Sequence, residues 1–122
     1  MNLILILINL GFIDLYDTMD LLENFIKFSI EFILKRNVID LKFINNNYSK
    51  NLIEDLQDII LKKFIKISYS EAIDILLKVS TNVRKDPFKN KIIWGINLSA
   101  EHEIYLTDIY FKNAVFIYDY PK

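Results

Sequence analysis

The sequence predicts an α+β fold made mainly of helices with a few short strands. Three observations lead to this prediction: long stretches with apolar residues at helical spacing, short apolar runs that end at turn residues, and capping residues between them. The 122 residues are 52% hydrophobic and 14% aromatic, which suits a buried core and argues against disorder. The predicted order is strand, helices, strand, helix, strand, helix, strand, and the strands are expected to belong to a larger sheet.

The first twelve residues form an apolar run that ends at Gly11 and Phe12. A buried strand is the favoured interpretation, because short continuous apolar runs are typical of one. The run is shorter than the roughly 20 residues that a membrane-spanning helix needs. It also lacks the basic start and the small-residue cleavage site of a signal peptide. A membrane-associated segment or an artefactual start is the alternative.

Residues 14–36 are predicted to form one long helix, with Asp14 or Asp17 as the cap. Its apolar residues form two rows: Leu15, Met19, Leu22, Ile26, Ile30 and Ile33, and beside them Leu21, Phe25, Phe28 and Phe32. A helix with so wide an apolar face is expected to be mostly buried.

The middle of the chain is expected to alternate short helices with one strand. Residues 41–47 predict a helical turn into a loop, and Ser49 is expected to cap a second helix. That helix has an apolar face made of Leu52, Ile53, Leu56, Ile59 and Ile60. Residues 64–67 alternate and predict a strand. Ser68 and Glu71 have the spacing of a capping box, which starts a third helix through about residue 78. Its inward face is predicted to be Ala72, Ile73, Leu76 and Leu77.

The last third is predicted to contain two strands and a helix. Residues 81–90 read as a polar loop, and residues 92–94 as a short strand ended by Gly95. Ser99 is expected to cap a fourth helix through about residue 112, and residues 114–118 predict the last strand. No internal repeat and no linker long enough to divide two domains is found.

Composition excludes several classes of function. The net charge is −1, so a large tRNA-binding surface on this chain alone is not expected. There is no Cys, which excludes disulfides and thiolate metal sites. The sequence also lacks a Gly-rich phosphate loop, a nucleophile elbow and a pair of histidines for a metal. Neither a catalytic residue nor a metal site is therefore assigned, although the single His together with carboxylates stays open as a metal-binding alternative.

Two features could carry chemistry, and each has two interpretations. Glu101, His102 and Glu103 lie in the first turn of the predicted fourth helix. Either the carboxylates favour the helix dipole and His102 is partly exposed, or the three form a polar site with the helix N-terminus as an anion subsite. Trp94, the only Trp, is either packed at the core or edge, or a stacking platform.

Four ordered stretches carry motifs of a known family. They are FIDLYDTMDL at residues 12–21, FIKISYSEAIDIL at residues 64–76, WGINLSAEHEIYL at residues 94–106 and VFIYDYPK at residues 115–122. Together they resemble the bacterial-type asparaginyl-tRNA synthetases, which are class II aminoacyl-tRNA synthetases of the Asp/Asn/Lys subgroup. The match covers about residues 9–122. The chain departs from the family at Asn97, Ile104 and Ala114, where the family has Asp, Arg and usually Pro, and in the run before Phe12.

The resemblance implies that residues 1–122 are an internal fragment of the class II antiparallel-sheet catalytic domain, between motifs 2 and 3. It implies a cytoplasmic ligase that uses ATP and Mg²⁺ to activate asparagine and transfers it to tRNA-Asn. No membrane is expected among its partners. Other synthetase fragments or a homodimer partner are the implied protein partners. By analogy, the amino-acid side of the site would include Trp94, Gly95, Glu101, His102 and Glu103.

The same resemblance limits what this chain can do alone. The arginines that motifs 2 and 3 bring to the ATP site have no counterpart in the sequence, and phosphoryl chemistry needs such charges in a preorganised site. The chain is therefore expected to be inactive alone and to bind neither ATP nor Mg²⁺ tightly. The alternative is a non-catalytic remnant, or a structural or interaction protein derived from that enzyme.

Overall fold

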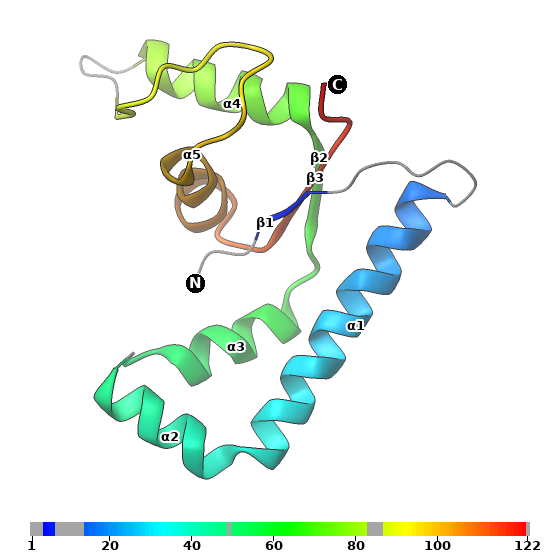
Figure 1. Cartoon of the computed structure of the whole chain (residues 1–122), viewed down its shortest axis with the longest axis vertical. Helices are drawn as coiled ribbons and strands as arrows, with labels where there is room; N and C mark the ends of the chain where they lie inside the picture. Colours follow the sequence, from blue (N-terminus) through cyan, green and yellow to red (C-terminus); the bar gives the residue numbers. More distant parts are fainter. Residues whose placement is uncertain (1–3, 7–13, 49, 83–86, 122) are drawn as a thin grey trace. The chain divides into compact units, whose positions relative to one another are not determined.

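The computed structural model describes residues 4–6, 14–48, 50–82 and 87–121. The elements follow in the order β1 (Ile4–Ile6), α1 (Leu15–Arg36), α2 (Val38–Asn47), α3 (Leu52–Leu61), β2 (Ile65–Ser68), α4 (Tyr69–Asn82), α5 (Ala100–Ile104), the π-helix η1 (Tyr105–Phe111) and β3 (Val115–Tyr118) (Figure 1). They fall into two compact units, one with α1, α2 and α3 and the other with the remaining elements. The predicted α+β class with mainly helices and short strands is confirmed.

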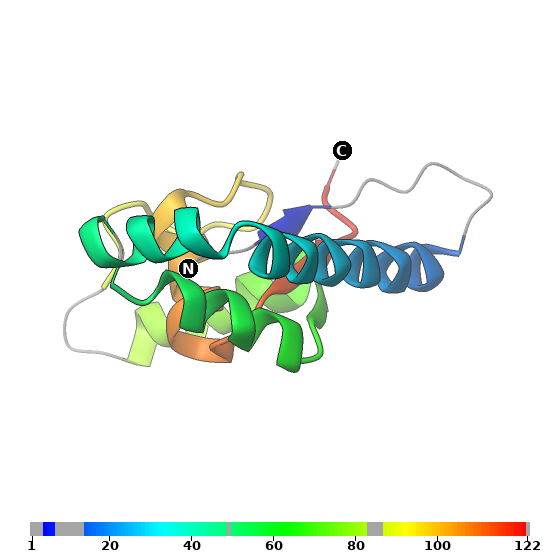
Figure 2. The ribbon, with the colours of Figure 1, turned by 90° about the horizontal axis from the view of Figure 1, so that it is seen from below.

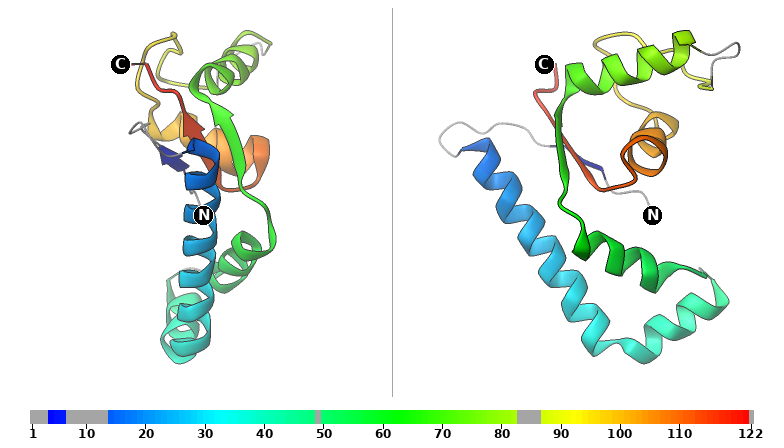
Figure 3. Two further views of the ribbon diagram at one scale, coloured as in Figure 1. Left: turned by 90° about the vertical axis from the view of Figure 1, so that its right-hand side faces the viewer. Right: turned by 180° about the vertical axis from the view of Figure 1, so that it is seen from behind.

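The second unit is built on a small parallel sheet with the strand order β1-β3-β2 (Figure 3). Ile4 of β1 and Ile65 of β2 both pair with Val115 of β3. The central strand β3 is an apolar run whose first three residues are fully buried, as is typical of a parallel strand covered on both faces. Every described strand pair is parallel, so the antiparallel sheet expected from the resemblance is not found among these residues.

Three of the four predicted strands are present, and the fourth prediction is wrong. The N-terminal run contains β1, residues 64–67 contain most of β2, and residues 114–118 contain β3. Residues 92–94 form no strand; Trp94 instead enters a turn with Gly95, which has φ +98°. The reason is that the hydrogen bonds of this turn go to side chains of α4 and to the Ile93 carbonyl within the turn, and not to a neighbouring strand.

Helix α1 begins where predicted but is not buried as predicted. The Asp14 Oδ1 atom accepts a hydrogen bond from the Tyr16 N–H at 2.9 Å, so Asp14 is the cap. Within the helix only Met19 and Glu23 are buried. The row of Leu21, Phe25, Phe28 and Phe32, here called the exposed α1 row, lies largely in solvent. The expectation of a mostly buried helix is therefore wrong for this chain: within its unit α1 packs against α2 and α3 (Figure 2), and this row stays exposed.

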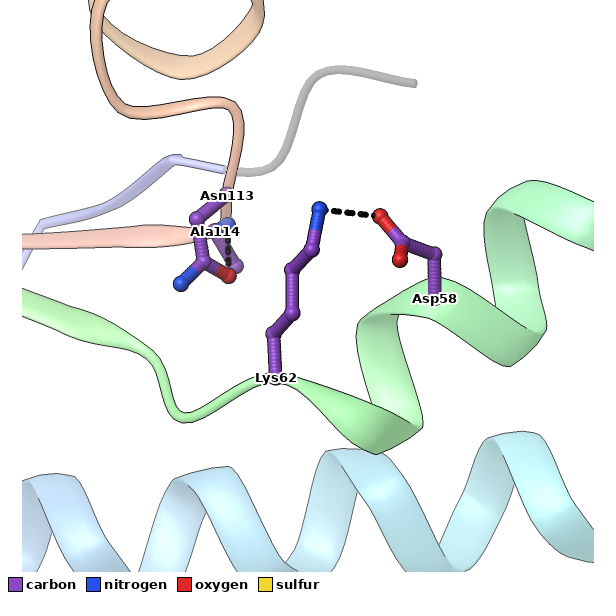
Figure 4. Close-up of polar contacts among 4 residues, drawn as sticks. All are labelled: Asp58, Lys62, Asn113 and Ala114. Atoms are coloured by element: carbon purple, nitrogen blue, oxygen red, sulfur yellow. Dashed lines mark hydrogen bonds and ion pairs between the residues drawn. The ribbon is translucent and has the colours of Figure 1, made fainter.

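Helices α2 and α3 complete the first unit. Helix α2 is longer than the predicted turn, since it begins at Val38. Helix α3 begins at Leu52, and the Asn45 side chain accepts a hydrogen bond from the Ile53 N–H at 3.2 Å. The predicted cap Ser49 lies outside the described residues. The five apolar residues predicted for this helix face are only half-buried, and its last turn carries an ion pair between Lys62 and Asp58 at 2.5 Å (Figure 4).

Helix α4 starts with the predicted capping box. The Ser68 N–H donates to Glu71 Oε2 at 2.8 Å, and the Glu71 N–H donates to Ser68 Oγ at 3.2 Å. The helix continues past its predicted end to Asn82. Its inward residues are buried except Leu77, which is half-buried. The core of the unit consists of Ile67, Tyr69, Ala72, Ile73, Leu76, Phe88, Ile92, Leu106, Val115 and Ile117.

The predicted fourth helix is present as α5 followed by η1. After Ile104 the helix widens from the α to the π pattern. The Thr107 hydroxyl donates to the Glu103 carbonyl at 3.0 Å, and a side chain that competes for helix carbonyls in this way disturbs the regular ladder. Lys112 then ends the helix in the left-handed region, and the Asn113 side chain accepts from the Ala114 N–H at the entry to β3 (Figure 4).

Candidate functional site

The candidate residues lie on the irregular stretch of residues 87–99 and on the first turn of α5, both in the second unit. No helix or strand holds the backbone in this stretch. Side chains of α4 and α5 take over that task at two places, here called the α5 anchor and the Tyr69 anchor. Four of the five predicted site residues belong to these anchors, and Glu103 belongs to neither.

In the α5 anchor, both carboxylate oxygens of Glu101 bind the preceding stretch. Oε2 accepts from the Lys89 N–H at 3.0 Å, while Oε1 accepts from the Asn90 N–H at 2.6 Å and from the Asn90 side-chain amide at 2.7 Å. Hydrogen bonds from the Lys89 and Asn90 amides lower the pKa of Glu101 below its usual 4.5, because they favour the charged form. Glu101 therefore acts on its own backbone in this structure.

His102 completes the α5 anchor. Its Nδ1 atom accepts from the Ser99 N–H at 3.2 Å, and its Nε2 atom donates to the Asn90 carbonyl at 3.0 Å. Because Nδ1 accepts a backbone N–H, the ring hydrogen belongs on Nε2, which faces the Asn90 carbonyl. The interpretation of His102 as partly exposed is wrong, since the ring is fully buried against the Phe88 ring. Neither ring nitrogen is left for a ligand.

The N-terminus of α5 is a poor place for an anion. The helix is five residues long, and its first turn carries the carboxylates of Glu101 and Glu103. A bound anion would meet these negative charges at once, whereas the charges themselves suit the helix dipole. The geometry thus favours the dipole interpretation over the anion subsite.

The Tyr69 anchor holds the turn at Trp94 and Gly95. The Tyr69 hydroxyl accepts from the Gly95 N–H at 3.0 Å and donates to the Ile96 carbonyl at 2.6 Å. Trp94 is not packed in the core: its side chain is 59% exposed, its Nε1–H donates to Ser70 Oγ at 3.3 Å, and its ring meets the Tyr69 ring edge-on at 5.9 Å. The indole is therefore held at one side and open at the other, which is the arrangement of a stacking surface.

Tyr120 links this turn to Glu103. The Tyr120 ring lies 4.8 Å from the Tyr69 ring, and its hydroxyl is buried without a hydrogen-bond partner among the described residues. Burial, the nearby Glu103 charge and Tyr69 together raise the pKa of Tyr120 to about 12. Glu101 and His102 are bonded to the backbone of residues 89 and 90. The Glu103 carboxylate makes no such bond, and Glu103 is half-buried.

Nothing in the described part of the chain fits a metal ion. No three side chains of the His, Cys, Asp or Glu type come together there, and both Glu101 oxygens already accept hydrogen bonds from residues 89 and 90. A pocket of about 310 Å³ lies between α4 and η1, away from all five predicted site residues; it is lined by Ile75, Lys78, Val79, Asn82, Tyr105 and Tyr110. Among the described helices, none combines the length and the apolar character needed to cross a membrane.

Sequence reasoning missed Tyr69 as a member of the site. Its partners Gly95 and Ile96 are 26 and 27 residues away, and no local pattern reveals a contact across that distance. The available signal was its place inside the Ser68–Glu71 capping box. That box sets Tyr69 as the first residue of α4, next to Ser70, which binds the indole.

Searches for relatives return a consistent result. No family model matches the chain. A segment of a protein from Cytophaga hutchinsonii is 39% identical over 113 residues, which is 93% of this chain and 23% of that protein. A Phocaeicola vulgatus protein is 39% identical over 112 residues, with 92% of this chain and 24% of that protein covered. A Clostridium beijerinckii protein is 38% identical, with 93% and 23% covered.

All three relatives are aminoacyl-tRNA ligases, and the chain is related to that class over nearly its whole length. More narrowly, each relative is an asparagine–tRNA ligase, so the resemblance found in the four motifs is confirmed. The chain spans about a quarter of the length of these relatives.

Proposed function

We propose that this chain supplies the part of an asparagine–tRNA ligase between motifs 2 and 3 of the class II catalytic domain, with residues 1–122 as a partial domain. Such a ligase would use ATP and Mg²⁺ to activate asparagine and would transfer it to tRNA-Asn in the cytoplasm. The observation that carries the proposal is the 39% identity over 113 residues to one segment of such a ligase.

We further propose that Trp94, Gly95 and Glu103 face the amino acid in the complete site. Glu103 offers a carboxylate that can accept hydrogen bonds from an ammonium group, and Trp94 offers an exposed aromatic face. Glu101 and His102 then support this surface from behind, because their polar atoms are already bonded to the chain.

The remaining machinery would come from polypeptide outside these 122 residues. Among the described residues, no three His, Cys, Asp or Glu side chains come together that could hold a magnesium ion. The exposed α1 row supports an assembly, because large contiguous apolar surfaces are typical of interaction sites. In that assembly the parallel strands would join the antiparallel sheet of a class II domain, completed by other fragments or by a homodimer partner.

Asparagine-dependent ATP–pyrophosphate exchange tests the proposal. The purified chain alone is expected to show no exchange. Mixed or co-expressed with the two flanking parts of the Cytophaga hutchinsonii ligase, it is expected to restore exchange, and Glu103→Gln is expected to raise the KM for asparagine. Exchange by the chain alone, or none with the flanking parts despite a stable complex, would overturn the proposal.

A non-catalytic remnant is the second candidate, and one observation favours it. Ile104 is 43% exposed on α5, at a position where the family has Arg, and Asn97 is exposed where the family has Asp. An apolar residue at an exposed position loses any ion pair that the arginine would make. The test adds the flanking parts to the natural chain and to the double variant Asn97→Asp, Ile104→Arg. If only the double variant restores exchange, the natural chain is a remnant.

A further inference from the structure

Tyr69 contacts all three residues of the turn at positions 94–96. It is fully buried at the start of α4, and its hydroxyl makes the two hydrogen bonds to the turn at Gly95 and Ile96. A phenol has one proton and accepts with its lone pairs, so it can clamp an N–H and a carbonyl at the same time. The 2.6 Å bond to the Ile96 carbonyl is short even for an O–H donor.

The clamped turn is also closed by a backbone hydrogen bond from the Ile96 N–H to the Ile93 carbonyl at 3.3 Å, which is longer than either bond of the Tyr69 hydroxyl. Gly95 has φ +98°, a conformation that side chains rarely adopt, and a Cβ placed there would meet nothing within 4 Å. The glycine is therefore required by the backbone conformation and not by crowding. A backbone in this conformation stays in place only when its surroundings fix it, and the Tyr69 hydroxyl bonds the Gly95 N–H and the Ile96 carbonyl directly.

The ring of Tyr69 also touches the two other aromatic members of the site. Trp94 lies edge-on to it at 5.9 Å, with an interplanar angle of 79°, and Tyr120 lies at 4.8 Å. The hydroxyl thus sets the turn that carries Trp94, while the ring sets the side of the indole that remains open. The same side chain therefore contacts both the backbone turn that carries Trp94 and one side of the Trp94 ring.

We infer that Tyr69 is a positioning residue that fixes Trp94 as a preorganised aromatic surface for the ligand of this site. The identity of that ligand as asparagine rests on the proposed function; the positioning does not. Tyr69 has no exposed surface of its own, so its effect reaches the site only through the Trp94–Gly95 turn.

The chain offers two clean reporters of this turn, since it has one Trp and two Gly residues. Selective ¹⁵N-glycine labelling of the 122-residue chain gives backbone signals from Gly95 and Gly11 alone. In the natural chain we expect the Gly95 amide to exchange with solvent more slowly than a free peptide amide. In Tyr69→Phe, which keeps the ring and removes the hydroxyl, its exchange is expected to become about fivefold to tenfold faster. The Trp94 fluorescence anisotropy is expected to fall in the same variant.

Two matched variants separate positioning from a general loss of structure. Tyr110→Phe removes the hydroxyl of an exposed tyrosine on η1 and is expected to change neither reporter. Ser70→Ala removes the partner of the indole and is expected to lower the Trp94 anisotropy while leaving Gly95 exchange unchanged. Far-UV circular dichroism checks that each variant keeps its helices.

The inference is overturned if Gly95 exchanges at the free-peptide rate in the folded natural chain, or if a folded Tyr69→Phe leaves both reporters unchanged. The first result remains decisive even if Tyr69→Phe does not fold. Neither reporter requires asparagine, ATP or tRNA, so failure here is distinct from failure of the proposed ligase function.

Discussion

The two compact units of this chain bury very different fractions of their apolar residues. In the second unit, strand β3, helix α4 and the π-helix share a continuous core, and Phe116 is completely buried. In the first unit, Met19 and Leu41 are the buried hydrophobic residues among those described, while Phe28 on the same helix as Met19 is 66% exposed. Both units have comparable apolar sequences, so composition alone does not decide burial; the presence of a packing partner does.

The largest expected effect compares one phenylalanine from each unit. Phe116→Ala removes a fully buried ring that packs against Phe64 at 5.8 Å, and we expect it to lower the free energy of unfolding by about 3–5 kcal/mol. Phe28→Ala removes a largely exposed ring and is expected to change it by less than about 0.5 kcal/mol. Urea denaturation of the isolated chain measures both. Equal losses would show that α1 is covered in solution.

The next prediction concerns association through the exposed α1 row. Apolar side chains this exposed favour contact with other molecules, so the isolated chain is expected to self-associate or to be poorly soluble. Phe25→Ser combined with Phe28→Ser should shift the chain toward monomer, as measured by light scattering after size-exclusion chromatography. As a control, Ile109→Ser changes a 57% exposed residue of the second unit, and we expect no shift. A monodisperse natural monomer would contradict the prediction.

A smaller effect is expected at high pH within the second unit. The pKa of Tyr120 is raised from 10.0 to about 12, so the folded state holds the phenol in its neutral form. The resulting stabilisation is complete below pH 10 and is lost as the pH rises from 10 to about 12. Absorbance titration should show a late tyrosine step near pH 12 that disappears in Tyr120→Phe. A late step that persists in the variant belongs to another tyrosine.

The smallest effect is expected at low pH in the α5 anchor. The pKa of Glu101 is lowered below 4.5, so its contribution is complete above that pH and is lost as the pH falls below it. Glu101→Gln should flatten the pH dependence of stability in this range and loosen the Asn90 amide in hydrogen exchange. Asp108→Asn, at an exposed position, is the matched control. If stability depends on pH in the same way in the natural chain and in Glu101→Gln, the Glu101 carboxylate does not stabilise the α5 anchor.

Local signals in the sequence predicted the local structure well. Asp14 caps α1, Ser68 and Glu71 form their capping box, and the apolar run at residues 114–118 forms the central strand. Each of these features depends on residues within a few positions of one another. The family resemblance likewise rests on short motifs and is confirmed by the relatives.

Features that depend on distant partners could not be predicted in this way. His102 is buried where its ring bonds the carbonyl of Asn90, 12 residues earlier in the chain, and the turn at Gly95 is bonded to the hydroxyl of Tyr69. The apolar pattern of α1 shows that the helix can be covered, but no pattern within this chain says by what. The roles of Trp94, Gly95 and Glu103 toward a substrate stay a proposal.

Hydrogen exchange along the isolated chain tests the contrast between the two units most directly. We expect slow exchange for the amides of β3 and for those of α4 beyond its first turn, which belong to a continuous core, and much faster exchange for α1, α2 and α3. Addition of the flanking parts of the ligase should then slow exchange in α1. Protection of α1 in the isolated monomer as strong as that of β3 would contradict the account.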